Sequence, residues 1–471
     1  MNILFTASEA LPYAASGGLA DVVGSLPKAI GRAGHDCRIV LPLYKGIKPE
    51  LKEKLKFLLN FTVDVGWRKQ YCGVFEGEVN GVKYYLLDNE YYFARDGLYG
   101  YYDDCERFVF LSRAVMELFS HIDFKPDIIN CNDWQTALVP VYYQCVYKFR
   151  PGYEDIKTVF TVHNIQYQGR YGMDVLSDII GLPMYHSKIL EYDGAINLMK
   201  GAFETADKIT TVSPSYAWEI LDPWYSHGMD RALAGKQYKL CGFLNGIDTE
   251  LYDPEKDSLI ARNFSAEDIS GKRDCKKALL KELKLSDDGS PVIGIITRFV
   301  SHKGIDLIKY VFEEMLNLGC EFAILGAGEK MFEDFFKEMS WRRNDRVSVN
   351  LGFKPDLARR IYAGADMFLM PSQSEPCGLA QMISMRYGTL PIVRETGGLR
   401  DSVRDAGGEN GNGFTFKTYN AHDMLSAVSR ANDYYHSDGW NDLVKHVMKE
   451  DYSWDSSAKL YIGLYESLCD D

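Results

Sequence analysis

A single acidic residue, Glu375, stands where a carboxylate could hold the hydroxyl groups of a sugar. The apolar residues 366–370 before it predict a short buried strand, and residues 379–387 after it predict a helix that ends at Gly388. Loops of this kind lie at the carboxyl ends of parallel strands, where open sheets bind ligands, and the helix start offers free N–H groups. The alternative is that Glu375 only complements the helix dipole.

Arg298 and Lys303 place two positive charges beside the start of another predicted helix. An apolar strand is predicted to end at Arg298, and Lys303-Gly304 opens the next helix. Fixed cations together with free N–H groups suit a diphosphate, where negative charge accumulates. Ordinary surface charges on a loop are the alternative. Two further strand-end loops, residues 326–329 and 396–399, are expected to line the same nucleotide pocket.

The pair Gly17-Gly18 lies between a predicted strand, residues 2–6, and a predicted helix, residues 19–32. Strand, glycine turn and helix start are the parts of an anion-binding site, because glycine lets the backbone approach a ligand closely. Two adjacent glycines fall short of a full nucleotide-binding fingerprint. An ordinary tight turn is the alternative.

Polar side chains also follow two strands in the first half of the chain. Asp133 comes shortly after the predicted strand of residues 127–130, and His163-Asn164 follow the strand of residues 156–162. A lone histidine at a strand end is commonly a hydrogen-bonded structural residue. Two strand ends that both carry polar groups favour a functional site.

Aromatic residues crowd together after a predicted antiparallel excursion, residues 57–88, in which Asn80-Gly81 indicates a type I′ hairpin. Sugars stack on aromatic rings, so the cluster is a candidate platform for a sugar chain, with Tyr101 the candidate contact. Packing with the hydroxyl at the rim is the commoner role of clustered tyrosines. The cluster comprises Tyr84, Tyr85, Tyr91, Tyr92, Phe93, Tyr99, Tyr101 and Tyr102.

Composition excludes several other classes of protein. The net charge of -13 argues against an electrostatic grip on nucleic acid or an anionic membrane. The ten cysteines include no Cys-x-x-Cys pair, so we expect reduced core residues and no zinc site. Met1 leads directly into a predicted strand, and no apolar run reaches the roughly 20 residues that span a bilayer. A soluble, cytoplasmic protein is expected.

Four segments, in this order and at this spacing, carry a resemblance to a known family. The sequence resembles the bacterial glycogen synthases and plant starch synthases, which are glucosyltransferases with the GT-B fold that use ADP-glucose. The similarity covers essentially the whole chain. The segments are Ser16-Gly-Gly-Leu-Ala-Asp-Val22, Thr161-Val-His-Asn164, Arg298 with Lys303-Gly304, and Glu375-Pro-Cys-Gly-Leu379.

Length and alternating strand and helix signals predict an α/β protein of two doubly wound domains. The resemblance implies that these are two Rossmann-like domains facing across a deep cleft. We expect an acceptor-glucan domain at residues 1–248 and a nucleotide-sugar domain at residues 249–454. The turn at Asn245-Gly246 is the expected crossing. The resemblance also implies that a C-terminal helix, residues 455–471, returns to the first domain.

The resemblance assigns roles to individual residues. It places the Gly17-Gly18 loop against the distal phosphate and the glucose of the donor, with Glu9 and Asp21 nearby. It makes His163 the partner of the glucose 6-hydroxyl and Asp133 a neighbour of the reaction centre. Glu375, Arg298 and Lys303 complete the expected catalytic set. Further residues expected to bind substrate are Asn164, Asn245, Tyr101, Cys377, Gly378, Leu379, Thr396, Gly397 and Gly398.

One position departs from the family pattern. Members often carry a lysine two residues before the glycine pair, whereas this chain has Ala15. The charge that this lysine offers to the phosphate is therefore missing, and Arg298 and Lys303 must supply more of it.

The implied reaction transfers glucose from ADP-glucose to the non-reducing end of an α-1,4-glucan such as glycogen or a malto-oligosaccharide, with retention and release of ADP. No second carboxylate nucleophile can be named, so front-face attack is the more economical mechanism. We expect neither a cofactor nor a metal, since the chain has no Asp-x-Asp motif.

Two rival functions stay open. A glycogen phosphorylase would share the fold class and use pyridoxal phosphate, but its Gly-Thr-Gly-Asn-Met-Lys motif has no counterpart here. A carbohydrate-binding or regulatory protein descended from a synthase is kept open by Ala15.

Overall fold

A computed structural model describes residues 1–470 of the chain. It divides into two compact units, one made of Met1–Gly246 with the segment from Trp454 onward, the other of Ile247–Ser453. These divisions fall two residues and one residue before the boundaries expected from the sequence. Residue 471, the end of the expected C-terminal segment, lies outside the described residues.

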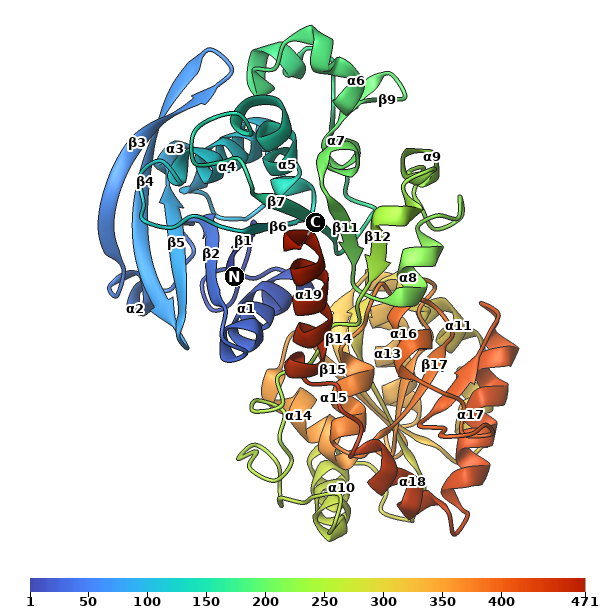
Figure 1. The fold of residues 1–471 in the computed structure, drawn as a ribbon. Helices are drawn as coiled ribbons and strands as arrows, with labels where there is room; N and C mark the ends of the chain where they lie inside the picture. Colours follow the sequence, from blue (N-terminus) through green and yellow to red (C-terminus); the bar gives the residue numbers. More distant parts are fainter. Residues whose placement is uncertain (471) are drawn as a thin grey trace. The chain divides into compact units, whose positions relative to one another are not determined.

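A nine-stranded sheet forms the centre of the first unit, in the order β12-β11-β7-β6-β1-β2-β5-β4-β3 (Figure 1). Neighbours from β12 to β5 are parallel, and β4 and β3 extend the sheet antiparallel. The parallel strands are mostly buried, as expected where helices cover both faces. The strands are β1 (Asn2–Thr6), β2 (Asp36–Pro42), β3 (Lys56–Val65), β4 (Arg68–Val79), β5 (Val82–Asp88), β6 (Ile128–Asn132), β7 (Lys157–Val162), β11 (Lys208–Thr211) and β12 (Leu240–Gly242).

The predicted hairpin at Asn80-Gly81 is confirmed. Asn80 has φ 51° and Gly81 has φ 79°, and the two residues join β4 to β5 in an antiparallel pair. Positive φ at both central residues is the type I′ geometry, whose twist matches that of the strands.

Helices and short turns fill the rest of the first unit. A small sheet of β8 (Arg170–Tyr171), β10 (Ala195–Asn197) and β9 (Glu191–Tyr192) accompanies them. Single turns of 3₁₀ or π helix lie at Trp134–Thr136, Tyr143–Tyr147, Leu176–Ile180, Met184–His186 and Gln237–Lys239. The α-helices are α1 (Gly18–Arg32), α2 (Pro49–Lys52), α3 (Glu90–Phe93), α4 (Asp104–Leu118), α5 (Leu138–Tyr142), α6 (Ser187–Leu190), α7 (Leu198–Thr205), α8 (Pro214–Glu219), α9 (Asp230–Leu233) and α19 (Trp454–Cys469).

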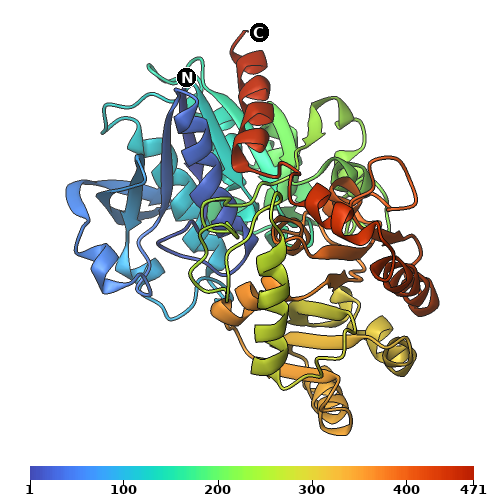
Figure 2. The ribbon, with the colours of Figure 1, turned by 90° about the horizontal axis from the view of Figure 1, so that it is seen from below.

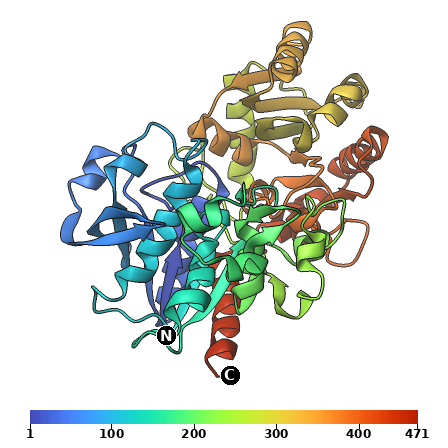
Figure 3. The same cartoon turned by 90° about the horizontal axis from the view of Figure 1, so that it is seen from above.

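The last helix, α19, belongs to the first unit although the whole second unit precedes it in sequence. It lies beside α1, and Arg32 pairs with Asp455 at 2.6 Å (Figure 2). Its Tyr465 is fully buried and accepts a hydrogen bond from Nδ2 of Asn130, on β6, at 2.9 Å. The two ends of the chain therefore meet on this unit, with Sγ of Cys469 3.9 Å from Sδ of Met1 (Figure 3).

A six-stranded, wholly parallel sheet forms the second unit, in the order β15-β14-β13-β16-β17-β18 (Figure 1). The strands are β13 (Val292–Phe299), β14 (Glu321–Gly328), β15 (Val347–Leu351), β16 (Met367–Met370), β17 (Leu390–Arg394) and β18 (Phe414–Phe416). The helices are α10 (Ser270–Leu283), α11 (Ile305–Tyr310), α12 (Phe312–Asn317), α13 (Lys330–Arg342), α14 (Pro355–Gly364), α15 (Ala380–Arg386), α16 (Gly397–Ser402), α17 (Ala421–Tyr435) and α18 (Trp440–Val447), with a 3₁₀ turn at Ser301–Lys303.

Apolar packing fixes helices to both faces of this sheet. Leu279 and Leu280 of α10 and Ile361 of α14 pack on Val292 of β13 and Leu325 of β14. Helix α17 contacts β17 and β18. This packing holds the sheet in place and so supports the loops of Arg298 and Glu375 at its strand ends.

The expectation of a loop at residues 326–329 is wrong, because Gly326 and Gly328 lie within β14. A Cβ on Gly326 would lie 1.9 Å from the carbonyl oxygen of Thr297, and one on Gly328 would lie 2.3 Å from that of Phe299. These glycines let β14 run close to β13, so the strand continues to Gly328 instead of giving way to a loop at residue 326.

Candidate active site

The strand orders of both sheets bring candidate residues together by topology. In the first unit β1 lies between β2 and β6, so the loops after β1 and β6 leave the sheet in opposite directions. In the second unit β13 and β16 form the corresponding pair. Such switch points open a crevice at the carboxyl ends of the strands, where doubly wound sheets bind ligands. The loops after β1 and β6 carry Glu9 and Asp133, and those after β13 and β16 carry Lys303 and Glu375.

Glu9 holds the glycine loop in place. Its side chain is 4% exposed and accepts hydrogen bonds from the backbone N–H and hydroxyl of Ser16, and from the Tyr99 hydroxyl at 3.2 Å. Burial raises the pKa of Glu9 despite these donors. Burial, and then the charge of Glu9, also raises the pKa of Asp21 to about 6. Both acidic residues therefore lie at the loop, as expected from the resemblance, but Glu9 is already bonded to it.

Gly17 and Gly18 occupy open space. Gly17 is the N-cap residue of α1, and no side-chain hydrogen bond caps this helix end. A Cβ built on either glycine would meet nothing within 4 Å. Packing within the described residues therefore does not require glycine at these two positions. The first turn of α1 faces this opening with its free N–H groups, which suits an approaching anion. Ala15 is exposed beside it and supplies no charge.

Asp133 ties the end of β6 to the end of β7. It adopts φ 57°, a conformation that non-glycine residues rarely hold, and its Oδ1 accepts the N–H of His163 at 2.7 Å and that of Asn164 at 3.4 Å. Burial raises its pKa to about 7, although the two N–H groups act in the opposite direction. Backbone strain of this kind is common at functional sites, where the surrounding structure maintains it.

His163 and Asn164 lie half-buried beyond β7. Burial lowers the pKa of His163 to about 3, so the imidazole is neutral at physiological pH. Its Nε2 lies 2.9 Å from Oδ1 of Asn132, a residue that the sequence analysis did not single out. Only its position directly before Asp133, at a strand end, could have indicated it. The Oδ1 of Asn164 accepts the N–H of Gln166 at 3.0 Å and so shapes the local turn.

Two other candidates of the first unit differ in character. Asn245 is 6% exposed, and its Oδ1 has no hydrogen-bond partner among residues 1–470. The hydroxyl of Tyr101 accepts the N–H of Gly97 at 3.0 Å, and its ring lies under the guanidinium groups of Arg95 and Arg107. Tyr101 therefore has a structural role in this conformation.

Most of the aromatic cluster is packed rather than presented to solvent. Tyr84, Tyr85, Tyr92 and Phe93 are at most 2% exposed, whereas Tyr91 is 62% and Tyr102 is 93% exposed. The commoner interpretation of clustered tyrosines accounts for the buried members, because the hydroxyls of the three tyrosines reach polar partners while all four rings fill the core.

In the second unit, Glu375 and Lys303 form an ion pair. Lys303 Nζ lies 2.7 Å from Glu375 Oε2, which also accepts the hydroxyl of Ser372 at 2.9 Å. The two charged side chains are only 17% and 10% exposed. The residues lie 72 positions apart in sequence and were predicted separately, one for the diphosphate and one for the sugar. Their contact makes them a single charged unit.

Close backbone approach assembles the loops around Glu375. A Cβ on Gly304 would lie 2.1 Å from the carbonyl oxygen of Pro371, and one on Gly397 would lie 2.1 Å from that of Glu375. Both glycines have positive φ, and the N–H of Gly398 donates to the carbonyl of Glu375 at 3.1 Å. The loops after β13, β16 and β17 can therefore meet only because these positions carry no side chain.

The remaining candidates of these loops lie at or shortly before the starts of α15 and α16. Cys377 is 6% exposed, Gly378 has φ 73°, and Leu379 precedes the first residue of α15. Thr396 is buried at the N-cap of α16, whose first turn contains Gly397 and Gly398.

Arg298 is the exposed cation of the group. It lies at the end of β13 and has no ion-pair partner among residues 1–470. Burial, and then the charges of Lys303 and Arg298, lower the pKa of His302, so these three residues lie near one another. The sequence analysis missed His302, although it directly precedes Lys303.

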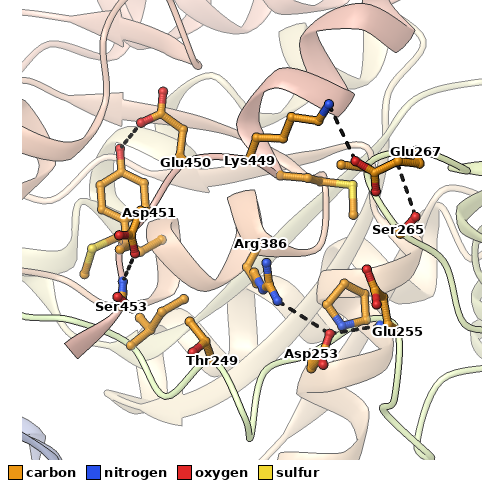
Figure 4. A pocket seen from close by; sticks show the side chains of 16 residues that line it. Thr249, Asp253, Glu255, Ser265, Glu267, Arg386, Lys449, Glu450, Asp451 and Ser453 are labelled. Atoms are coloured by element: carbon orange, nitrogen blue, oxygen red, sulfur yellow. Dashed lines mark hydrogen bonds and ion pairs between the residues drawn. The ribbon is translucent and has the colours of Figure 1, made fainter. Parts of the chain in front are cut away.

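A hollow of about 430 Å³ in the second unit lies away from these residues (Figure 4). It is lined by the segments 247–255, 265–267 and 448–453 and by Met382 and Arg386. Arg386 ends α15, whereas the loop of Glu375 precedes the start of that helix. None of the candidate residues lines this hollow.

Three further observations concern metals, thiols and membranes. Among residues 1–470, no group of three or more His, Cys, Asp or Glu side chains is arranged to hold a metal ion. All ten cysteines are free thiols, most of them buried. No helix of this described part combines the length and the apolar character needed to cross a bilayer.

Comparison with known proteins identifies both units as parts of a glycosyltransferase. Residues 2–235 match the family described as the starch synthase catalytic domain, and residues 277–433 match glycosyl transferases group 1. The chain is 46% identical over 474 residues to the glycogen synthase of Bacillus cereus (strain B4264), covering 99% of this chain and 100% of that one. It is also 46% identical over 476 residues to the glycogen synthase of Clostridium botulinum (strain Eklund 17B / Type B), covering 99% of each.

Solved structures agree. The catalytic domain of starch synthase IV from Arabidopsis thaliana, bound to ADP and acarbose, matches with a TM-score of 0.91 and 35% identity, over 100% of this chain and 99% of that one. Sucrose-phosphate synthase from Thermosynechococcus elongatus matches with a TM-score of 0.61 at 15% identity, over 99% and 98%, a likeness that shows the fold alone. The chain therefore has the GT-B fold and belongs to the family of glycogen and starch synthases, enzymes that transfer glucose.

Proposed function

We propose that this glucosyltransferase takes ADP-glucose as donor and extends the non-reducing end of an α-1,4-glucan, such as glycogen or a malto-oligosaccharide. The observation that carries the proposal is the Lys303–Glu375 pair at the switch point of the second sheet, with Arg298 exposed beside it. A diphosphate requires fixed positive charge and a sugar requires hydrogen-bond acceptors, and this loop cluster offers both within a few ångströms. The related starch synthase IV was solved with ADP and acarbose bound, which supports a nucleotide donor and a glucan acceptor.

In this proposal the second unit binds the diphosphate. Arg298 and Lys303 stabilise the negative charge that grows on the leaving phosphate as the glycosidic bond breaks, and the N–H groups of the first turn of α16 face the same anion. Glu375 accepts hydrogen bonds from glucose hydroxyls. Since Lys303 is shared between Glu375 and the donor, it orients the carboxylate as well as neutralising phosphate.

The first unit contributes the glycine loop and the tips of β6 and β7. The loop of Gly17 and Gly18 receives the distal phosphate and glucose, held in shape by Glu9. His163 binds a glucose hydroxyl, and Asp133 lies beside the acceptor. The remaining expected contacts are Asp21, Asn164 and Asn245.

Transfer proceeds with retention by front-face attack. The acceptor hydroxyl oxygen bonds to the anomeric carbon on the side from which the phosphate oxygen departs, and that oxygen takes the acceptor's proton as ADP leaves. Neither a cofactor nor a metal ion takes part in this scheme, because cationic side chains supply the charge that a metal supplies at other nucleotide-sugar sites.

The test is nucleotide release by the purified chain with glycogen as acceptor, comparing ADP-glucose with UDP-glucose. We expect release of ADP, with elongation of malto-oligosaccharides by single glucose units and little release of UDP. Faster turnover with UDP-glucose would reject the proposed donor. Glucan binding without any nucleotide release would favour a regulatory role, and an absorbance band of an internal aldimine would indicate a phosphorylase.

A further inference from the structure

A buried amide network lies directly behind His163. Asn130 and Asn132, on β6, are 1% and 2% exposed, and Tyr465, on α19, is fully buried. Three consecutive hydrogen bonds join Tyr465 to Asn130, Asn130 to Asn132, and Asn132 to His163, at 2.9, 3.0 and 2.9 Å. Buried polar groups are costly unless bonded, so a network of this extent in an apolar core needs a reason.

The orientation of the Asn132 amide follows from its surroundings. Its Nδ2 faces three oxygen acceptors: the carbonyls of Thr6 and Asn130, at 3.1 and 3.3 Å, and Oδ1 of Asn130, at 3.0 Å. The opposite orientation would set the amide oxygen against these three oxygens with no hydrogen between them. Asn132 must therefore turn Oδ1 toward His163.

This orientation determines where the imidazole carries its proton. His163 Nε2 lies 2.9 Å from an oxygen that can only accept, so Nε2 must carry the hydrogen. In the neutral ring, Nδ1 is then a bare acceptor. We propose that Asn132 is a positioning residue that locks His163 as the Nε2–H tautomer, so that Nδ1 accepts a hydrogen bond from a substrate hydroxyl.

Two features keep the Asn132 amide, and with it the His163 tautomer, fixed. Oδ1 of Asn130 accepts from both Asn132 and the hydroxyl of Thr161, at 3.0 and 3.2 Å, which leaves Nδ2 of Asn130 to donate to Tyr465. Every amide in the network thus has one satisfied orientation. The network also links His163, on the loop after β7, to helix α19. Tyr465 of that helix therefore takes part in fixing the tautomer of the imidazole.

The neutral state of the ring supports the assignment. Burial lowers the pKa of His163 to about 3, and the Asp133 carboxylate accepts from the backbone N–H of His163 rather than from its ring. A protonated imidazole would present a hydrogen at Nδ1 and could not accept from a hydroxyl. The identity of that hydroxyl rests on the proposed function, in which His163 binds glucose, whereas the tautomer does not.

The decisive experiment is heteronuclear NMR of the whole chain labelled with ¹⁵N at its histidine rings. The chain has nine histidines, and the signals of His163 are assigned by their loss in His163→Gln. We expect a protonated-type shift at Nε2 and an unprotonated-type shift at Nδ1, unchanged between about pH 6 and about pH 8. The Nδ1–H tautomer, or an imidazolium in this range, would overturn the inference. The outcome does not depend on which nucleotide sugar the enzyme uses.

Mutation tests whether the fixed tautomer of His163 matters to the reaction. Asn132→Ala removes the acceptor for Nε2–H, so we expect a mixture of tautomers and a fall in kcat of tenfold or more, with ADP affinity unchanged because Arg298 and Lys303 are intact. Tyr465→Phe leaves Asn130 without its acceptor, and we expect a smaller loss of the same kind.

The matched control for Tyr465→Phe is Tyr142→Phe. Tyr142 is also fully buried, and its hydroxyl donates to the carbonyl of Ile180 at 2.8 Å, outside the network. Its variant should keep both the tautomer and kcat. If Asn132→Ala folds and retains full kcat, the positioning role is wrong even where the wild-type tautomer is as expected. If the wild type shows the tautomer but releases no ADP from ADP-glucose, the proposed function fails and the tautomer assignment stands.

Discussion

The Lys303–Glu375 pair allows a prediction whose size follows from the structure. Lys303→Ala removes a cation from the proposed diphosphate site and also leaves the Glu375 carboxylate, 10% exposed, with Ser372 as its remaining side-chain donor. Breaking one partner of a fully buried pair costs about 3–5 kcal/mol of stability. Because both side chains retain some solvent contact, we expect about 2–3 kcal/mol here. For a unit of this size, that lowers Tm by roughly 4–12 °C.

The kinetic effect is separate from the loss of stability. Charge on the leaving diphosphate grows as the bond breaks, so Lys303→Ala should lower kcat about a hundredfold, which corresponds to about 3 kcal/mol. Glu375→Gln should also lose most turnover, while ADP binding hardly changes. Arg298→Ala is the comparison, because its exposed side chain has no ion-pair partner among residues 1–470. It should lose kcat to a similar degree with little change in Tm.

The double variant Lys303→Ala with Glu375→Gln provides the sharpest assay. Since no unpaired charge is left behind, the stability that the double variant loses should be smaller than the sum of the two single losses by about 1–3 kcal/mol. Steady-state kinetics at saturating glycogen and thermal melts of all four variants measure both quantities. Strictly additive losses of stability would refute the ion pair as a structural unit. A raised KM with unchanged kcat in Lys303→Ala or Arg298→Ala would show that the residue only anchors the nucleotide.

Three further changes have defined outcomes. Activity should survive EDTA, because cationic side chains compensate the diphosphate, and full loss restored by Mg²⁺ or Mn²⁺ would contradict this. Ala15→Lys adds a cation beside the glycine loop, so the KM for ADP-glucose should fall several-fold; an unchanged KM would show that the two cations of the second unit suffice. The pKa of Asp133 is raised to about 7 in the folded state, so this group stabilises the fold at low pH and loses that contribution as pH rises from about 4 through about 7. Asp133→Asn keeps the acceptor for His163, so its Tm relative to wild type should increase between about pH 5 and about pH 8, and a constant difference would argue against the raised pKa.

The supports of the site were predictable from local sequence. The strand before Glu375 and the helix after it were expected at residues 366–370 and 379–387, and the structure has β16 at Met367–Met370 and α15 at Ala380–Arg386. Such short buried strands stand out as apolar runs, and glycine marks the helix end. The hairpin at Asn80-Gly81 was also predictable from the sequence, because few other residue pairs adopt positive φ at both turn positions.

Contacts between distant loops were not predictable in the same way. Strand periodicity places Lys303 and Glu375 each at a strand end, but their pairing depends on β13 and β16 being neighbours, which is a property of the strand order. The glycines at 326 and 328 were misread for the same reason. In the sequence, a Gly-x-Gly pattern at a strand end is identical to that of a loop. Only the close approach of β14 to β13 explains why glycine stands at these two positions.

The same reasoning explains why Asn132 was missed. An asparagine in a buried strand next to a candidate site residue has no distinguishing local pattern, and its role depends on Thr6 of β1, Asn130 of β6 and His163 after β7. Those three partners lie on adjacent strands, so the switch point that brings the loops together also brings the amide and the imidazole together. In this fold, therefore, the strand order does more than open a crevice for ligands. It also brings the Asn132 amide to the imidazole of His163, and through this contact we infer that it sets which ring nitrogen carries the proton.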